Sequence, residues 1–148
     1  MTQRLAGFKV APGAYRAMKG LEDYSAANVD PVLYELVKLR ASFVNGCAYC
    51  IDMHVHDALK AGESQQRLFL VAAWHEAEDH FTERELAAFA LTDAVTKISE
   101  HGVPEDVWQR AAAQFDEKEL TDLITAIVTI NAWNRLAISM RTDVPKRP

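Results

Sequence analysis

The segment from Leu120 to Ile138 predicts a helix that is apolar on more than one side, and this feature constrains the fold most. Asp116 and Glu119 match a capping signature just before it, in which each side chain can bond the other residue's backbone N–H. A helix of this kind must be covered on several sides, by the core or partly by another subunit. Its apolar positions are Leu120, Leu123, Ile124, Ile127, Val128, Ile130, Trp133, Leu136 and Ile138.

Helix start and stop signals occur along the rest of the chain. Asp30-Pro31 is an acidic cap followed by proline at the first helical position, and Asn45-Gly46 is a stop. Thr82 and Glu85 form another capping box. The expected helices cover 14–26, 31–45, 47–61, 65–73, 83–100, a short stretch from Pro104, and the segment after Asp116. The polar stretch 74–80 is expected to be a connection, and residues 143–148 are expected to fray.

These signals predict an all-α fold, a bundle of about six to seven helices, because no convincing run of alternating strand residues occurs. The chain has 148 residues, of which 49% are hydrophobic and 25% are charged, and this composition fits one domain over 1–148. The net charge is -5 and the 16 basic residues are scattered, which argues against a nucleic-acid partner. No apolar stretch approaches the ~20 residues that span a bilayer, so we expect a cytoplasmic protein with no membrane partner.

Cys47 and Cys50 are the two cysteines of the chain, and His54 follows four residues after the second. If Cys47 opens a helix, Cys50 and His54 lie one and two turns further along the same face. A thiol at a helix N-terminus is favoured as the thiolate. Two cysteines in a chain of this size indicate a redox or metal pair rather than a disulfide framework.

At these residues the chain resembles the AhpD-like alkylhydroperoxidases within the carboxymuconolactone decarboxylase superfamily. The resemblance rests on Glu35, on Cys47-x-x-Cys50 twelve residues later, and on His54. The element Asn131-x-Trp133-Asn134-Arg135, which resembles the closing helix of the family, supports it.

The resemblance implies an all-helical thiol peroxidase or disulfide reductase. Cys50 would be the peroxidatic thiol, Cys47 the resolving thiol that exchanges with a reductant, and Glu35 with His54 the proton relay. Tyr49 lies where some members carry a relay histidine, and we include it in the candidate site. We expect a hydroperoxide substrate, an external dithiol or lipoyl-type electron donor and no bound cofactor. We also expect a homo-oligomer, a trimer or a hexamer.

The same chemistry follows from the residues themselves. A thiolate cleaves a peroxide and becomes a sulfenic acid, which a second thiol condenses to a disulfide. Two thiols three residues apart on a helix can bridge with modest adjustment. An imidazole and a carboxylate nearby can take the thiol proton and return one to the leaving alcohol. The helix dipole favours Cys47, but it fades beyond the first turn, so direct activation by His54 favours Cys50.

Three alternatives remain open at this point. The chain could be a non-catalytic thiol redox sensor. It could bind zinc through Cys47, Cys50 and His54, with His56 or His75 as the fourth ligand. It could also be a decarboxylase-like enzyme of small acids in which the cysteines are incidental. His56 has no other assigned role.

Overall fold

A computed structural model of the chain describes residues 2–146, which are mostly helical and contain no β-strand. The all-α prediction is confirmed. The elements are α1 (Gly7–Val10), α2 (Pro12–Asn28), α3 (Pro31–Asn45), α4 (Ala48–Lys60), α5 (Gln65–Leu70), the 3₁₀ turns η1 (Val71–Glu76) and η2 (Glu78–His80), α6 (Glu83–Thr96), α7 (Ile98–His101), α8 (Glu105–Ala112) and α9 (Glu117–Met140).

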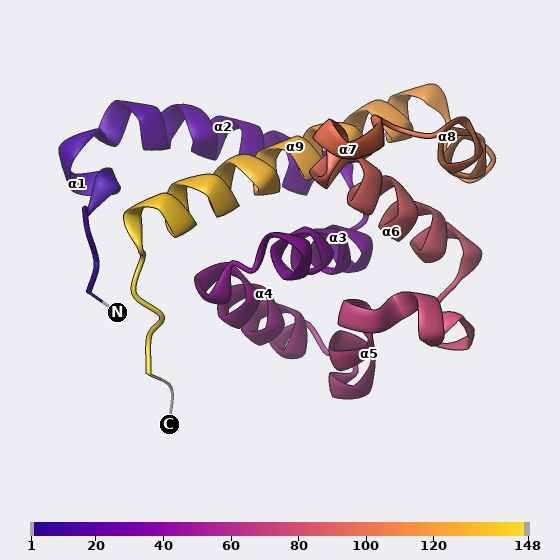
Figure 1. Cartoon of the computed structure of the whole chain (residues 1–148), viewed down its shortest axis with the longest axis horizontal. Coiled ribbons are helices and arrows are strands. Elements are labelled where there is room, and N and C mark those ends of the chain that lie inside the picture. Colours follow the sequence, from indigo (N-terminus) through magenta and orange to yellow (C-terminus); the bar gives the residue numbers. More distant parts are fainter. Residues whose placement is uncertain (1, 147–148) are drawn as a thin grey trace.

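The C-terminal helix α9 lies along the middle of the molecule, as its apolar sides require. It packs against α2, α3 and α6, and Figure 1 shows α2 running beside it (Figure 1). Leu123, Ile127 and Ile130 of α9 are fully buried. Burial of such side chains stabilises the fold by about 1.5–3 kcal/mol each.

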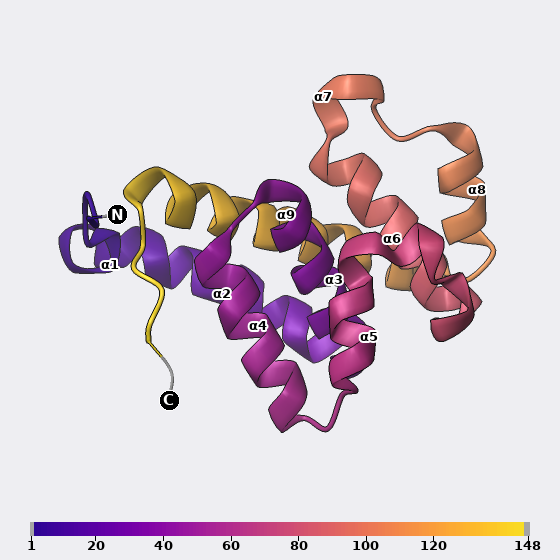
Figure 2. The same ribbon diagram turned by 60° about the horizontal axis from the view of Figure 1, so that its bottom comes forward.

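Helix α3 connects two parts of the hydrophobic core. One side of α3, including Val37, joins the cluster formed with α6, α8 and α9. Leu36 and Leu39 join the second cluster, with α4, α5 and η1. Figure 2 shows α4 and α5 descending side by side from this part of the molecule (Figure 2). Because α3 is fixed on both sides, it is a rigid support for residues at its surface.

Both ends of α3 lie where the capping signals of the sequence predicted. At its start, Asp30 accepts hydrogen bonds from two backbone N–H groups at 3.0 and 3.1 Å. Gly46 ends α3 with a φ of 68°, a left-handed conformation that glycine adopts without strain. Cys47 is then the N-cap residue of α4, with its N–H donating to Ser42 O at 3.0 Å.

Two expected helices are interrupted. The predicted helix 83–100 breaks at Lys97, so α6 and α7 are separate. The predicted helix 65–73 ends at Leu70, and the backbone at Ala73 is not helical. Arg40 donates to the carbonyls of Val71 and Ala72 at 3.2 and 2.7 Å, which satisfies these groups in the 3₁₀ segment. The stretch 74–80, expected to be a connection, contains the end of η1 and the whole of η2.

The two ends of the described chain lie close together (Figure 1). The Arg4 N–H donates to Met140 O at 2.9 Å, which ties the N-terminal segment to the end of α9. Residues 142–146 form no helix. The expected fraying of 143–148 stays a prediction, and residues 147–148 lie outside the described residues.

By length and composition alone, α9 could cross a membrane, and within residues 2–146 this is true of no other helix. The prediction that no apolar stretch approaches this length was wrong for α9. The packing of α9 explains the composition, because its sides face α2, α3 and α6. Its buried Asn131 and Asp122 are hydrogen-bonded to Thr96 of α6 and Tyr24 of α2.

Candidate active site

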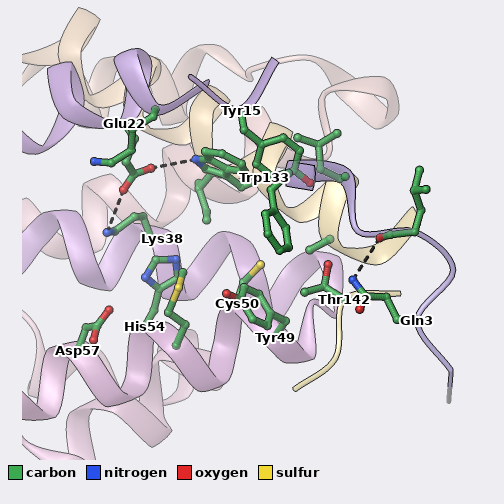
Figure 3. A pocket seen from close by; sticks show the side chains of 18 residues that line it. Gln3, Tyr15, Glu22, Lys38, Tyr49, Cys50, His54, Asp57, Trp133 and Thr142 are labelled. Carbon is green, nitrogen blue, oxygen red and sulfur yellow. Dashed lines mark hydrogen bonds and ion pairs between the residues drawn. The ribbon is translucent and has the colours of Figure 1, made fainter. Parts of the chain in front are cut away.

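A cavity of about 650 Å³ lies between α2, α4, α9 and the N-terminal segment (Figure 3). Its volume is within the usual range for sites that hold small molecules. The wall is largely apolar, with polar groups from α2, α3 and α4 at one side. The larger apolar residues are Phe8, Tyr15, Met53, Trp133 and Leu136.

The two cysteines form a disulfide at the start of α4, with their Cα atoms 5.4 Å apart. Both residues are buried. Cys50 lines the cavity, whereas Cys47 is not among the lining residues. The spacing predicted that the two thiols can bridge, and the structure contains this bridge. It follows that the cavity gives access to the pair through Cys50.

His54 lies on the cavity wall one turn after Cys50, at the position that the helical spacing predicted (Figure 3). Its side chain is buried, and its Nδ1 lies 3.1 Å from Glu35 Oε2. An ionised carboxylate only accepts hydrogen bonds, so Nδ1 donates the proton in this contact, and in a neutral imidazole the lone pair is then on Nε2. This Nε2 is buried and has no hydrogen-bond partner within residues 2–146.

Glu35 projects from α3 toward His54, so the structure brings these two predicted residues together. Glu35 Oε1 accepts a hydrogen bond from Lys38 Nζ at 2.8 Å while Oε2 faces the imidazole. Burial opposes ionisation of the carboxyl group, but the His54 contact and the Lys38 charge outweigh it and lower the pKa of Glu35. The carboxylate is therefore ionised at neutral pH.

Lys38 and Glu22 belong to the same cluster and were missed in the sequence. Lys38 is buried, lies 3.5 Å from Glu22 Oε1 and sits 3.9 Å from the centre of the Tyr34 ring. Glu22 also accepts a hydrogen bond from Tyr34 Oη at 2.7 Å. It accepts another from Trp133 Nε1 at 3.1 Å (Figure 3). Burial and the Glu22 carboxylate raise the pKa of Tyr34. Lys38 could have been found by its spacing of three from Glu35, but Glu22 is distant in sequence.

Tyr49 also lies on the cavity wall and is half-buried (Figure 3). His56 is half-buried on α4 and does not line the cavity. His75 stacks on Trp74, 3.6 Å between ring centres, and lies 3.7 Å from Asp93, in a different part of the molecule from the cysteines. Within residues 2–146, no group of three His, Cys, Asp or Glu side chains could hold a metal ion.

The element 131–135 of α9 supports the site from behind. Asn45 Nδ2 donates to Asn131 Oδ1 and Asn134 Oδ1, both at 2.9 Å, and Asn134 Nδ2 donates to Ser42 Oγ at 3.1 Å. These bonds tie the end of α3, and with it the turn into Cys47, to α9. Trp133 in the same element faces the cavity.

Known sequences are similar to the chain over most of its length. The sequence profile of the carboxymuconolactone decarboxylase family matches residues 12–94. The chain is 38% identical over 141 residues to the uncharacterized protein YdfG of Bacillus subtilis, covering 95% of each chain. It is 28% identical over 117 residues to the uncharacterized protein YnjA of Escherichia coli, covering 79% of this chain and 62% of that protein.

Solved structures share the fold. A protein of unknown function from Agrobacterium tumefaciens, described as a candidate antioxidant defence protein AhpD, superposes with a TM-score of 0.95 at 38% identity, covering 99% of this chain and 100% of that one. The debrominase Bmp8 has a TM-score of 0.83 at 18% identity, covering 93% of this chain and 74% of that one, and shares the fold alone.

Proposed function

The chain belongs to the carboxymuconolactone decarboxylase family, and we propose that within it the protein is an AhpD-like thiol peroxidase that reduces organic hydroperoxides. One observation carries the proposal. His54 Nε2 is buried, lacks a partner within the described residues, and lies on the cavity wall one helical turn from Cys50. An unsatisfied buried nitrogen costs about 1–3 kcal/mol, so its natural partner is the thiol or the substrate.

The reaction begins with the reduced pair. Cys50 passes its proton to His54 Nε2, and the thiolate attacks the terminal oxygen of the hydroperoxide. The O–O bond breaks, the alkoxide takes the proton back from His54, and an alcohol leaves. Cys50 is now a sulfenic acid, which the Cys47 thiol attacks to release water and form the disulfide. Per turnover, one hydroperoxide is reduced to alcohol and water, and two thiols are oxidised.

Glu35 accepts a hydrogen bond from the Nδ1–H of His54, which fixes the tautomer and the orientation of the ring. It also stabilises the imidazolium that forms while the thiol is deprotonated. Such acid–base assistance is worth typically about 10²–10⁴ in rate. Tyr49 lines the same wall, and its hydroxyl can donate to the oxygen that leaves.

An external dithiol, such as a lipoyl-type donor, returns the pair to its reduced state. The resemblance implies exchange at Cys47, but both cysteines are buried, and Cys50 lines the cavity whereas Cys47 does not. We therefore place the donor's attack on Cys50, with Cys47 as the leaving thiolate. Cys47 is the N-cap residue of α4, where the helix dipole stabilises a thiolate. The mixed disulfide on Cys50 is resolved by the donor's second thiol.

The test is consumption of an organic hydroperoxide with dihydrolipoamide as donor, together with zinc content by elemental analysis. We expect turnover by the wild-type protein, no turnover by a Cys47→Ser/Cys50→Ser double variant, and no stoichiometric zinc. Absence of turnover in a protein whose disulfide forms reversibly would favour a redox sensor. Conversion of small acids by the double variant would favour the decarboxylase-like alternative.

We also propose that the protein works in the cytoplasm as a homo-oligomer, a trimer or hexamer. Phe69 of α5 and Val128 of α9 are more than half exposed, and apolar surface of this kind is commonly covered by a second copy. Light scattering at micromolar concentration tests the assembly. A monomeric mass would contradict it.

A further inference from the structure

The outer wall of the cavity is built by the two ends of the chain. Leu5 and Phe8 come from the N-terminal segment and Leu136 from the end of α9. Arg4 ties these ends together, with its N–H bonded to Met140 O at 2.9 Å and its Nη1 to Ser139 O at 3.2 Å. Figure 3 shows Gln3 and Thr142 at this side of the cavity, away from His54 (Figure 3). The wall and the reactive groups therefore lie at different sides of the same cavity.

Gly7 allows the N-terminal segment to lie this close to α9. A Cβ at this position would be 2.5 Å from Met140 Sδ and 2.6 Å from Tyr15 Oη, well inside contact distance. Because glycine has no Cβ, α1 packs against the end of α9 and Phe8 lines the cavity.

The wall that results is aromatic. The Phe8 ring packs edge-on against Tyr15 with 6.5 Å between centres, and Tyr15 packs against Trp133 at 5.6 Å. Phe8 is 55% exposed, so one part of its ring faces the cavity mouth rather than the core. Aromatic rings in such a row offer a broad apolar surface to a ligand.

The two lysines that line the cavity are already paired. Lys38 contacts Glu35 and Glu22, and Lys19 pairs with Asp23 on the outer rim. Within residues 2–146 the cavity wall offers no other lysine or arginine. Glu22 and Asp57, which also line it, would repel an anion. A negatively charged substrate would have to give up its hydration without a partner in return.

The volume of the cavity also favours large peroxides over small ones. Hydrogen peroxide has two heavy atoms, and a water molecule takes about 30 Å³ of liquid volume. A cavity of about 650 Å³ would stay mostly filled with water around such a substrate. An apolar body would displace that water from the aromatic wall, gaining roughly fourfold in affinity for each methylene buried.

We propose that the cavity selects uncharged hydroperoxides with a bulky apolar body, and that Phe8 is a specificity-determining residue for them. The proposal rests on the proposed peroxidase function for the identity of the reacting group. The preference itself is a property of the cavity, so it can be measured by binding as well as by turnover.

Binding is tested with cumyl alcohol, the uncharged product expected from cumene hydroperoxide, by calorimetry on the full chain. The comparison ligand is the same alcohol carrying a para carboxylate. We expect the neutral alcohol to bind at least roughly tenfold tighter, and Phe8→Ala to weaken it about fourfold, the effect of about one methylene contact. Val10→Ala is the matched control, since Val10 lies on the same short helix, is 65% exposed and does not line the cavity.

Turnover is tested by comparing kcat/KM for cumene hydroperoxide and hydrogen peroxide. We expect a preference for cumene hydroperoxide that Phe8→Ala reduces while leaving hydrogen peroxide unchanged. Equal use of both peroxides with no effect of Phe8→Ala would overturn the specificity inference and leave the peroxidase function standing. Selective binding of the neutral alcohol without any peroxide turnover would overturn the peroxidase function and leave the preference of the cavity standing. Tighter binding of the carboxylate would overturn the inference in either case.

Discussion

The chain contains two partly buried carboxylate clusters that are alike in composition. They differ in whether every polar group has a hydrogen-bond partner. Around Asp93, Arg40 donates Nε to Oδ1 at 2.6 Å and Nη2 to Oδ2 at 2.8 Å, and Trp74 donates to Oδ2 at 3.2 Å. Arg40 also bonds two carbonyls of η1. This cluster joins α3, α6 and η1, and its groups are satisfied by one another.

In the cluster around Glu35 the carboxylate is paired in the same way, but one nitrogen of the histidine has no hydrogen-bond partner among the described residues. Glu35 accepts a hydrogen bond from Lys38 and contacts His54 Nδ1, but His54 lines the cavity and its buried Nε2 has no partner among the described residues. Charge and burial are therefore poor guides to function, since both clusters have them. The open hydrogen-bonding atom beside a cavity is what distinguishes a candidate reactive group from a structural one.

The largest effect on stability should come from breaking the closed cluster. Arg40→Met leaves Asp93 without its main partner, and we expect a loss of about 3 kcal/mol in the free energy of unfolding. This is the lower end of the usual range, because 20% of the Asp93 side chain is exposed. Urea denaturation measures the loss, and the exposed Arg16→Met serves as control. The thiol chemistry of the folded fraction should be unchanged, and a specific loss of turnover would remove the distinction between the clusters.

Glu35→Gln should lower the activity and leave the stability nearly unchanged, the opposite of Arg40→Met. It keeps the size of the side chain and removes the charge that holds the His54 tautomer, so we expect the peroxidase rate to fall by roughly 10². Thermal stability should change little. Steady-state kinetics and a melting curve on one preparation check both statements, with the exposed Glu76→Gln as control. Wild-type turnover in Glu35→Gln would make the open cluster a structural one.

The boundaries of these helices could be predicted because caps and stops are local. Asp30, Gly46, Thr82 and Asp116 act on backbone groups within four residues, and the observed helix ends agree with them. The contact of Glu35 with His54 was expected from the family resemblance. The spacing within one helix contains no information about a partner on the next helix.

The remaining features depend on packing between distant segments, which a single sequence does not display. Glu22 reaches Lys38 from α2 and Trp133 reaches Glu22 from α9. The break at Lys97 was missed, because the residues around it have ordinary helix propensity. The wall at Phe8 depends on Gly7 meeting Met140 at the other end of the chain.

A smaller effect is expected in the pH dependence of stability. The pKa of Glu35 is lowered in the folded protein, so its ionised form contributes stability above the ordinary glutamate range of about 4 to 5. That contribution is lost as the pH falls through the lowered pKa. The difference in Tm between wild type and Glu35→Gln should therefore be constant near neutral pH and shrink on acidification. Thermal melts between pH 7 and pH 3 measure it, and a difference that grows toward low pH would contradict the sign.

The smallest effect is expected at Tyr49. The Glu35–His54 pair is complete without the Tyr49 hydroxyl, so Tyr49→Phe should lower the peroxidase rate by less than about tenfold. Single-turnover kinetics with an organic hydroperoxide provide the value. A loss of rate comparable to that of Glu35→Gln would show that Tyr49 is part of the proton relay.

The identity of the sulfur that meets the peroxide tests the account most directly. Reduced Cys47→Ser and Cys50→Ser proteins are each treated with one equivalent of cumene hydroperoxide in the presence of dimedone, and the label is located by peptide mass spectrometry. The cavity reaches Cys50 and His54 lies one turn beyond it, so the account predicts one label on Cys50 in Cys47→Ser and no peroxide-dependent label in Cys50→Ser. Label on Cys47 with peroxide consumed, and none on Cys50, would contradict it.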